Sequence, residues 1–185
     1  MNRPVTIAVA ASLAMLTACG KSDDSISAKN ASIDEINAKV ADAKKGGAFM
    51  APGHWSHTMQ IVDIDFPGEM PAAAREQMKT AMGQVQTSET CLTPEEARNP
   101  RERFTKNLGD ACVYDHFEMG GGTIDAKMSC SGGGAKRVMT MKGRYSPDSY
   151  TMEVASQGEG AGPAAMGMQM RMSGERTGDC KPGES

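Results

Sequence analysis

The chain has few aromatic side chains, no long apolar run and no block of like charge. Aromatic residues make up only 4% of its 185 residues, and Trp55 is the single tryptophan. The most apolar stretch, residues 5–18, is shorter than the roughly 20 residues that a membrane-spanning helix needs. With a net charge of −3 and no basic cluster, the chain lacks the positive surface on which nucleic-acid binding depends. We therefore expect a chain that binds no nucleic acid and folds as one ordinary domain.

The sequence also lacks the usual patterns of catalytic and metal sites. No Cys-x-x-Cys pair is present, which argues against a zinc site. Ser173 is not part of a nucleophile-elbow pattern, and the glycine runs at 120–122 and 132–134 precede predicted strands, whereas a phosphate cradle precedes a helix. His54 and His57 are expected on opposite faces of one strand, as exposed or edge residues, so they are poorly placed to share a metal ion. We therefore predict that the protein is not an enzyme and holds no cofactor.

The N-terminal segment has the features of an export signal. Residues 5–18 are almost wholly apolar and follow a single cation, Arg3, as in the short apolar core of a signal peptide. Leu16 and Ala18 precede Cys19, and this arrangement resembles the bacterial lipobox, in which a signal peptidase cuts before a cysteine that carries lipid. The alternative is an ordinary secretory signal in which Cys19 is not modified.

A lipoprotein signal at residues 1–18 implies a mature protein that begins at Cys19 and is held to a membrane by acyl chains. Several chains anchor durably, whereas a single chain anchors only marginally. The resemblance to Gram-negative lipoproteins, with Gly20 in place of an acidic residue after the cysteine, implies an anchor in the outer membrane and a domain that faces the periplasm. Residues 19–31 are small and polar and are predicted to form a flexible tether. The membrane is the partner that the sequence indicates.

Four cysteines remain besides the one at position 19. They are Cys91, Cys112, Cys130 and Cys180. An even number in an exported chain predicts two disulfides in an oxidising compartment. Four cysteines allow three pairings, and the residues alone leave the choice open.

Between residues 51 and 180, segments rich in strand formers alternate with turns that contain glycine and proline. Strands are predicted at 54–66, 84–92, 112–119, 123–130, 135–145, 150–156 and 165–178, and short helices at 32–46, 71–82 and 93–100. Residues 181–185 are left as a tail. Consecutive strands with tight turns predict a mainly β domain: one antiparallel meander of about seven strands, strongly curved or forming an open barrel, with two or three short helices. Within 54–66 the apolar phase shifts after Ile61, which predicts a bulge or a bend.

Methionine is frequent, with 16 residues, and several occupy alternate positions of predicted strands. Side chains at alternate positions of a strand project from one face, about 7 Å apart. The predicted face comprises Met139, Met141, Met152, Met166, Met168, Met170 and Met172, and the opposite face carries Lys127, Lys136, Glu153, Gln169 and Arg171. Three interpretations remain open: a buried core, an adaptable surface for apolar ligands such as acyl chains, and a Cu(I) site made of thioethers. The regular alternation along one strand favours packing.

Three segments, in order, resemble a family of small exported bacterial proteins known as domain of unknown function 3617. Pro52-Gly53-His54-Trp55 is similar to its opening motif, and Cys91-Leu92-Thr93-Pro94-Glu95 to its central segment. The stretch 170–180 is similar to its methionine-rich last strand, which closes in Gly-Asp-Cys. The resemblance covers 51–180, implies a β-rich domain with paired cysteines, and leads us to favour the pairs Cys91–Cys112 and Cys130–Cys180. It implies no catalytic residue, because the family has no established activity.

The sequence thus predicts a membrane-anchored periplasmic lipoprotein. We expect a non-catalytic role in binding or in maintaining the cell envelope. Two more specific alternatives concern the methionine face: binding of an apolar ligand or lipid, and handling of Cu(I).

Overall fold

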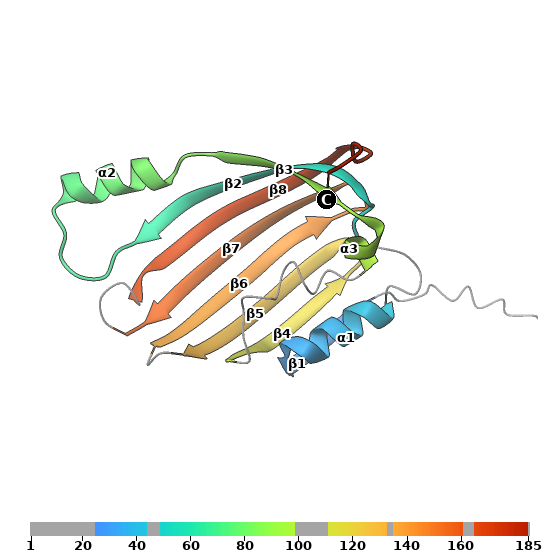
Figure 1. Ribbon diagram of the computed structural model, residues 1–185. Helices are drawn as coiled ribbons and strands as arrows, with labels where there is room; N and C mark the ends of the chain where they lie inside the picture. The colour runs from blue at the N-terminus through green and yellow to red at the C-terminus, as the bar shows by residue number, and fades with distance from the viewer. Residues whose placement is uncertain (1–24, 44–48, 99–110, 133–134, 161–164, 185) are drawn as a thin grey trace, which may run out of the picture.

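The computed structural model describes residues 25–43, 49–98, 111–132, 135–160 and 165–184. These residues form one antiparallel sheet of eight strands in the order β1-β4-β5-β6-β7-β8-β2-β3 (Figure 1), and the sheet does not close. The strands are β1 (Ile26–Ser32), β2 (Gly53–Asp65), β3 (Gln86–Leu92), β4 (Cys112–Gly120), β5 (Thr123–Gly132), β6 (Ala135–Tyr145), β7 (Ser149–Glu159) and β8 (Gly167–Gly178). The helices are α1 (Ile33–Ala43), α2 (Ala72–Met82) and α3 (Pro94–Arg98). The predicted mainly β, antiparallel fold with short helices is confirmed.

The eighth strand lies where the sequence predicted a flexible tether. Residues Ile26–Ser32 form β1, which pairs antiparallel with β4 at one edge of the sheet. Asn30 has a φ of 50°, a left-handed conformation that asparagine tolerates. Ala31, directly after it, is buried in the core, and Ala28, two residues before it, packs against the core. The small polar composition concealed this strand, since few of its residues are apolar. The rest of the predicted tether, 19–24, and the predicted signal at 1–18 lie outside the described residues.

Local signals in the sequence account for the helix starts. The Glu35 N–H donates to Ser32 Oγ at 3.1 Å, which caps α1. In α3 the capping is reciprocal: the Glu96 N–H donates to Thr93 Oγ1 at 3.2 Å, and the Thr93 N–H donates to the Glu96 carboxylate at 2.9 Å. None of the helices in the described residues is both long enough and apolar enough to span a bilayer.

The hydrophobic core lies at two places on the sheet rather than along its whole width. The larger cluster forms where α1 packs against β1 and β4 (Figure 1), and its buried members are Ile26, Ala31, Ile36, Cys112, Tyr114, Phe117, Ala126 and Met128. The smaller cluster surrounds Trp55 near α3, with Leu92 and Ala97 buried and Met50 and Tyr150 partly buried. The two clusters lie toward opposite edges of the sheet.

Two disulfides are present, but the predicted pairing is wrong. The bonds join Cys112 to Cys130 and Cys91 to Cys180, with Cα–Cα distances of 4.0 and 5.4 Å. Cys91 and Cys112 cannot pair because β3 is one edge strand and β4 lies beside the other edge, with five strands between them.

A bulge in the β4–β5 hairpin brings Cys112 opposite Cys130. The hairpin turns at Gly121 and Gly122, whose φ angles of 58° and 78° fit the tight turn that favours glycine. Next to the turn, Gly120 pairs with Thr123, and this register alone would continue to Cys112 opposite Ser131. A register shift between Tyr114 and His116 moves the pairing by one residue. The disulfide therefore depends on a bulge that the cysteine spacing does not reveal.

Candidate functional site

One face of the sheet carries three rows of mostly apolar side chains that run across seven strands. Residues that pair directly across neighbouring strands share a face, so the register defines each row. The first row is Ile26, Met119, Ile124, Gly143, Met152, Met172 and Met59; the second is Ala28, Phe117, Ala126, Met141, Val154, Met170 and Ile61; the third is Ala31, Tyr114, Met128, Met139, Ser156, Met168 and Ile64. We call this surface the apolar face.

The apolar face is covered at its β1–β4 side and open toward β7, β8 and β2. Helix α1 packs on β1 and β4, whereas no described helix makes extensive contact with β7 or β8. The side chains of Met59, Met152, Met168, Met170 and Met172 are each partly exposed, and none of them belongs to a buried cluster of the described residues. The part of the apolar face on β7, β8 and β2 thus carries partly exposed, flexible thioether side chains.

The structure places six of the seven predicted methionines on the apolar face. Met139 and Met141 pack against the cluster under α1, and Met152, Met168, Met170 and Met172 lie in its open part. Met166 precedes β8 and has no ladder partner there. Sequence reasoning missed Met59, which lies opposite Met172 because β2 pairs with β8 despite their distance along the chain.

The predicted bulge in β2 is confirmed and keeps the rows in phase. The register of β2 against β8 shifts between Ile61 and Asp63. The extra residue, Val62, is 40% exposed, whereas Ile64 returns to the apolar face and is 2% exposed. Without the bulge, the polar and apolar positions at this end of β2 would be exchanged.

The opposite face of the sheet is charged, as the sequence predicted. Asp125 lies 2.9 Å from His116 Nε2 and 3.0 Å from Lys142 Nζ. The hydrogen bond from His116, and after it the one from Lys142, hold the pKa of the Asp125 carboxyl below its usual value. Arg171 and Glu153 pair across β7 and β8 at 3.4 Å. Exposed pairs of this kind add little stability, so their main consequence is that this face stays in water.

A shallow depression on the charged face lies near the ends of β2 and β8. Asp63, Asp65, Gln157 and Gln169 contribute to its lining. Lys79 of α2 lies 2.8 Å from Asp63, and this contact lowers the pKa of the Asp63 carboxyl. Ser156 and Met168, which belong to the third row of the apolar face, also contribute to the lining.

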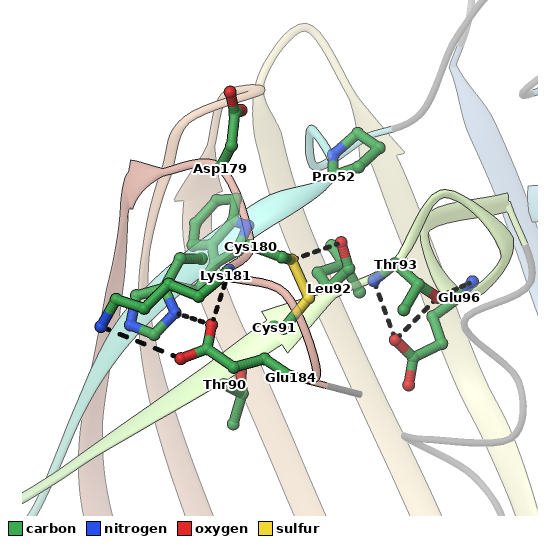
Figure 2. Close-up of a disulfide and its surroundings, with 12 residues drawn as sticks. Pro52, Thr90, Cys91, Leu92, Thr93, Glu96, Asp179, Cys180, Lys181 and Glu184 are labelled. Atoms are coloured by element: carbon green, nitrogen blue, oxygen red, sulfur yellow. Dashed lines mark hydrogen bonds and ion pairs between the residues drawn. A yellow bond between two sulfur atoms is a disulfide. The ribbon is translucent and has the colours of Figure 1, made fainter.

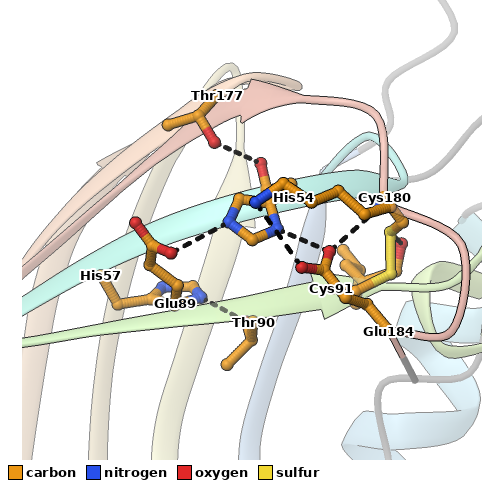
Figure 3. A network of polar contacts seen from close by, with 10 residues as sticks. His54, His57, Glu89, Thr90, Cys91, Thr177, Cys180 and Glu184 are labelled. Atoms are coloured by element: carbon orange, nitrogen blue, oxygen red, sulfur yellow. Dashed lines mark hydrogen bonds and ion pairs between the residues drawn. A yellow bond between two sulfur atoms is a disulfide. The ribbon is translucent and has the colours of Figure 1, made fainter.

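An aromatic cluster closes the end of the apolar face next to α3. The Trp55 side chain is fully buried, and its Nε1–H donates to the carbonyl of Ala51 at 3.0 Å. The His57 ring stacks on it with a centroid distance of 6.2 Å. His57 Nδ1 lies 3.0 Å from Tyr150 Oη. The other ring nitrogen, Nε2, lies 2.8 Å from Thr90 Oγ1 (Figure 3). Burial raises the pKa of the Tyr150 hydroxyl, which favours its neutral form.

His54 lies on the other side of β2, where it contacts the segment that follows β8. Its Nδ1 is 3.0 Å from the Glu184 carboxylate and its Nε2 is 3.4 Å from Glu89 (Figure 3). The Lys181 N–H donates to Glu184 and lowers the pKa of that carboxyl. The Cys91–Cys180 disulfide lies beside this network (Figure 2). The two histidines do lie on opposite faces, but neither is as exposed as expected.

The described histidines and cysteines lie in structural contacts. In the part of the chain that the structure describes, no three histidine, cysteine or carboxylate side chains are grouped to hold a metal ion. All four described cysteines are bonded in disulfides. The apolar face is therefore the strongest candidate for a functional surface.

Comparison with known proteins identifies the family of this chain. Searches of curated proteins and of solved structures find no match. The family model described as protein of unknown function (DUF3617) matches residues 50–180, which include every strand except β1. The chain belongs to the DUF3617 family.

Proposed function

We propose that this protein is a lipid-anchored periplasmic protein that binds an acyl chain on its apolar face and catalyses no reaction. The observation that carries the proposal is the open half of this face. Met59, Met152, Met168, Met170 and Met172 are partly exposed on adjacent strands, while Glu153 and Arg171 of β7 and β8 point to the other side. Contiguous apolar surface of this kind on a soluble domain is typical of ligand or partner sites.

The dimensions of the open part suit a hydrocarbon chain. From Met168 to Met172 the face extends about 14 Å along β8, at about 3.4 Å per residue. Across β7, β8 and β2 it extends about 10 Å, at about 4.8 Å per strand. Methionine favours such a role because its flexible, polarizable side chain repacks around ligands of different shape.

The lipid anchor supplies the context for this ligand. Cys19, placed after Leu16 and Ala18, is the residue that we propose to be acylated, and its acyl chains would anchor the protein in the outer membrane. A domain held at a bilayer is surrounded by acyl chains, so a soft apolar face would meet its ligand there at high local concentration.

Ligand binding is tested on the exported chain with Cys19→Ser, which keeps the protein in solution. A fluorescent long-chain fatty acid is expected to bind saturably. Met170→Glu is expected to weaken binding at least about tenfold, since an unpaired charge in an apolar contact costs several kcal/mol. Gln169→Glu provides the matched control, because this neighbouring side chain is exposed on the opposite face and should leave affinity unchanged.

Met170→Leu should retain binding, which separates loss of the apolar surface from loss of the fold, and circular dichroism reports folding of each variant. Absence of saturable binding by the parent protein, or equal affinity for the Met170→Glu variant, would refute the proposed ligand.

The anchor has its own test. Cys19→Ser is expected to remove the protein from the outer-membrane fraction, because the acyl chains supply the affinity for that membrane. Mass spectrometry of the N-terminal peptide should show a diacylglyceryl adduct on Cys19 in the parent protein. An unmodified peptide and unchanged fractionation would show that the leader is an ordinary secretory signal.

A further inference from the structure

The register of β7, β8 and β2 places three methionines in one cross-strand row. Met172 of β8 lies directly opposite Met152 of β7 on one side and Met59 of β2 on the other. Directly opposed side chains have Cβ atoms about 5 Å apart. All three side chains are partly exposed.

This row differs from the methionine stripe along β8. Successive methionines of that stripe, such as Met170 and Met172, are about 7 Å apart along the strand, and each points straight out of the sheet. Across the strands the spacing is shorter, and the two outer side chains flank the middle one. Three rotatable bonds allow each methionine sulfur to swing toward the centre of the row.

We propose that Met59, Met152 and Met172 bind a soft monovalent cation, Cu(I), through their three thioether sulfurs. Thioethers select Cu(I), whereas carboxylates and imidazoles select harder ions. The neighbouring row contributes Ile61, Val154 and Met170, none of which offers a hard ligand. Beyond the other side of the row, His57 has both ring nitrogens in hydrogen bonds to Tyr150 and Thr90. The site is therefore built from neutral soft donors.

The experiment offers Cu(I) to the exported chain with Cys19→Ser under anaerobic conditions. Ascorbate keeps the metal reduced, and a chromogenic Cu(I) chelator competes for it. A free-thiol assay before and after titration shows that both disulfides remain closed, since released thiolates would bind Cu(I) themselves. The parent protein is expected to withdraw one equivalent of Cu(I) from the chelator.

Two triple variants distinguish the row from the rest of the face. Met59→Leu, Met152→Leu and Met172→Leu together should weaken Cu(I) affinity by at least roughly tenfold, because even changes outside a metal's direct ligands cost that much. Met139→Leu, Met141→Leu and Met168→Leu together remove as many sulfurs from the same face and should leave affinity unchanged. Leucine conserves volume and apolarity, so both variants should fold and should still bind the fatty acid.

The proposal fails if the parent protein binds no Cu(I) with its disulfides intact, or if the two triple variants lose affinity equally. Its failure leaves acyl-chain binding unaffected, since that activity depends on apolar surface and not on sulfur. Conversely, a protein that binds Cu(I) but no fatty acid would retain the thioether site and lose the proposed function.

Discussion

Replacing Cys91 and Cys180 together by serine is expected to lower the free energy of unfolding by about 4.6 kcal/mol. The bond joins residues that are 89 positions apart, and closing a loop of that length in the unfolded chain accounts for a loss of about this size. It also connects the edge strand β3 to the segment that follows β8, across β2 (Figure 2). The variant should therefore release residues 180–184 from the sheet, including the Glu184 contact with His54.

Denaturant unfolding followed by circular dichroism measures the effect. The comparison variant is Cys112→Ser with Cys130→Ser, whose cysteines are only 18 positions apart and for which a loss of about 3 kcal/mol is expected. The order of the two losses is the sharper test, because it depends on loop length alone. A larger loss for the hairpin disulfide would show that local strain or residual structure outweighs chain entropy at these bonds.

Trp55→Ala is expected to cost about 3–5 kcal/mol, the usual range for removing a large buried aromatic side chain. Trp55 has no exposed surface, contacts the cluster of Leu92 and Ala97, and stacks on His57. Its loss leaves a cavity where β2, β3 and α3 meet, and it leaves the Ala51 carbonyl without its indole donor. Far-ultraviolet circular dichroism is the suitable probe, since the substitution removes the single tryptophan and its fluorescence.

Two control variants accompany the stability measurement of Trp55→Ala. Trp55→Phe keeps an aromatic ring in the cluster but not the indole N–H, so it should cost clearly less than the alanine variant. Val113→Ala, at a side chain that is 40% exposed, should change stability by no more than about 0.5 kcal/mol. An alanine variant at position 55 that is as stable as the Val113 variant would mean that the Trp55 cluster contributes nothing to the fold.

Features set by neighbouring residues could be predicted, and features set by strand order could not. The capping pairs at Ser32 and Thr93, the glycine turn at 121–122 and the bulge after Ile61 each depend on a few adjacent residues. The antiparallel meander from β4 to β8 follows from them, because each strand pairs with the next. The alternation of methionine in β8 likewise defines its face without any long-range information.

The pairing of distant segments needed the structure. Strand β1 pairs with β4, and β2 pairs with β8, across long stretches of chain. Local periodicity indicates neither partner, so the sequence predicts a tether where β1 lies and does not include Met59 in the methionine face. The cysteine pairing was wrong for the same reason: β3 lies at the far edge from β4, and the register of Cys112 depends on one bulge.

Under the proposed lipid anchor at Cys19, the edge strand β1 would also limit the distance between the sheet and the membrane. The sequence predicts a tether over residues 19–31, but the sheet already begins at Ile26. Seven residues at full stretch reach only about 25 Å, at about 3.5 Å each. With Cys19 lipidated as proposed, the β1 edge of the sheet would lie within about 25 Å of the bilayer surface, and the β3 edge could lie farther away.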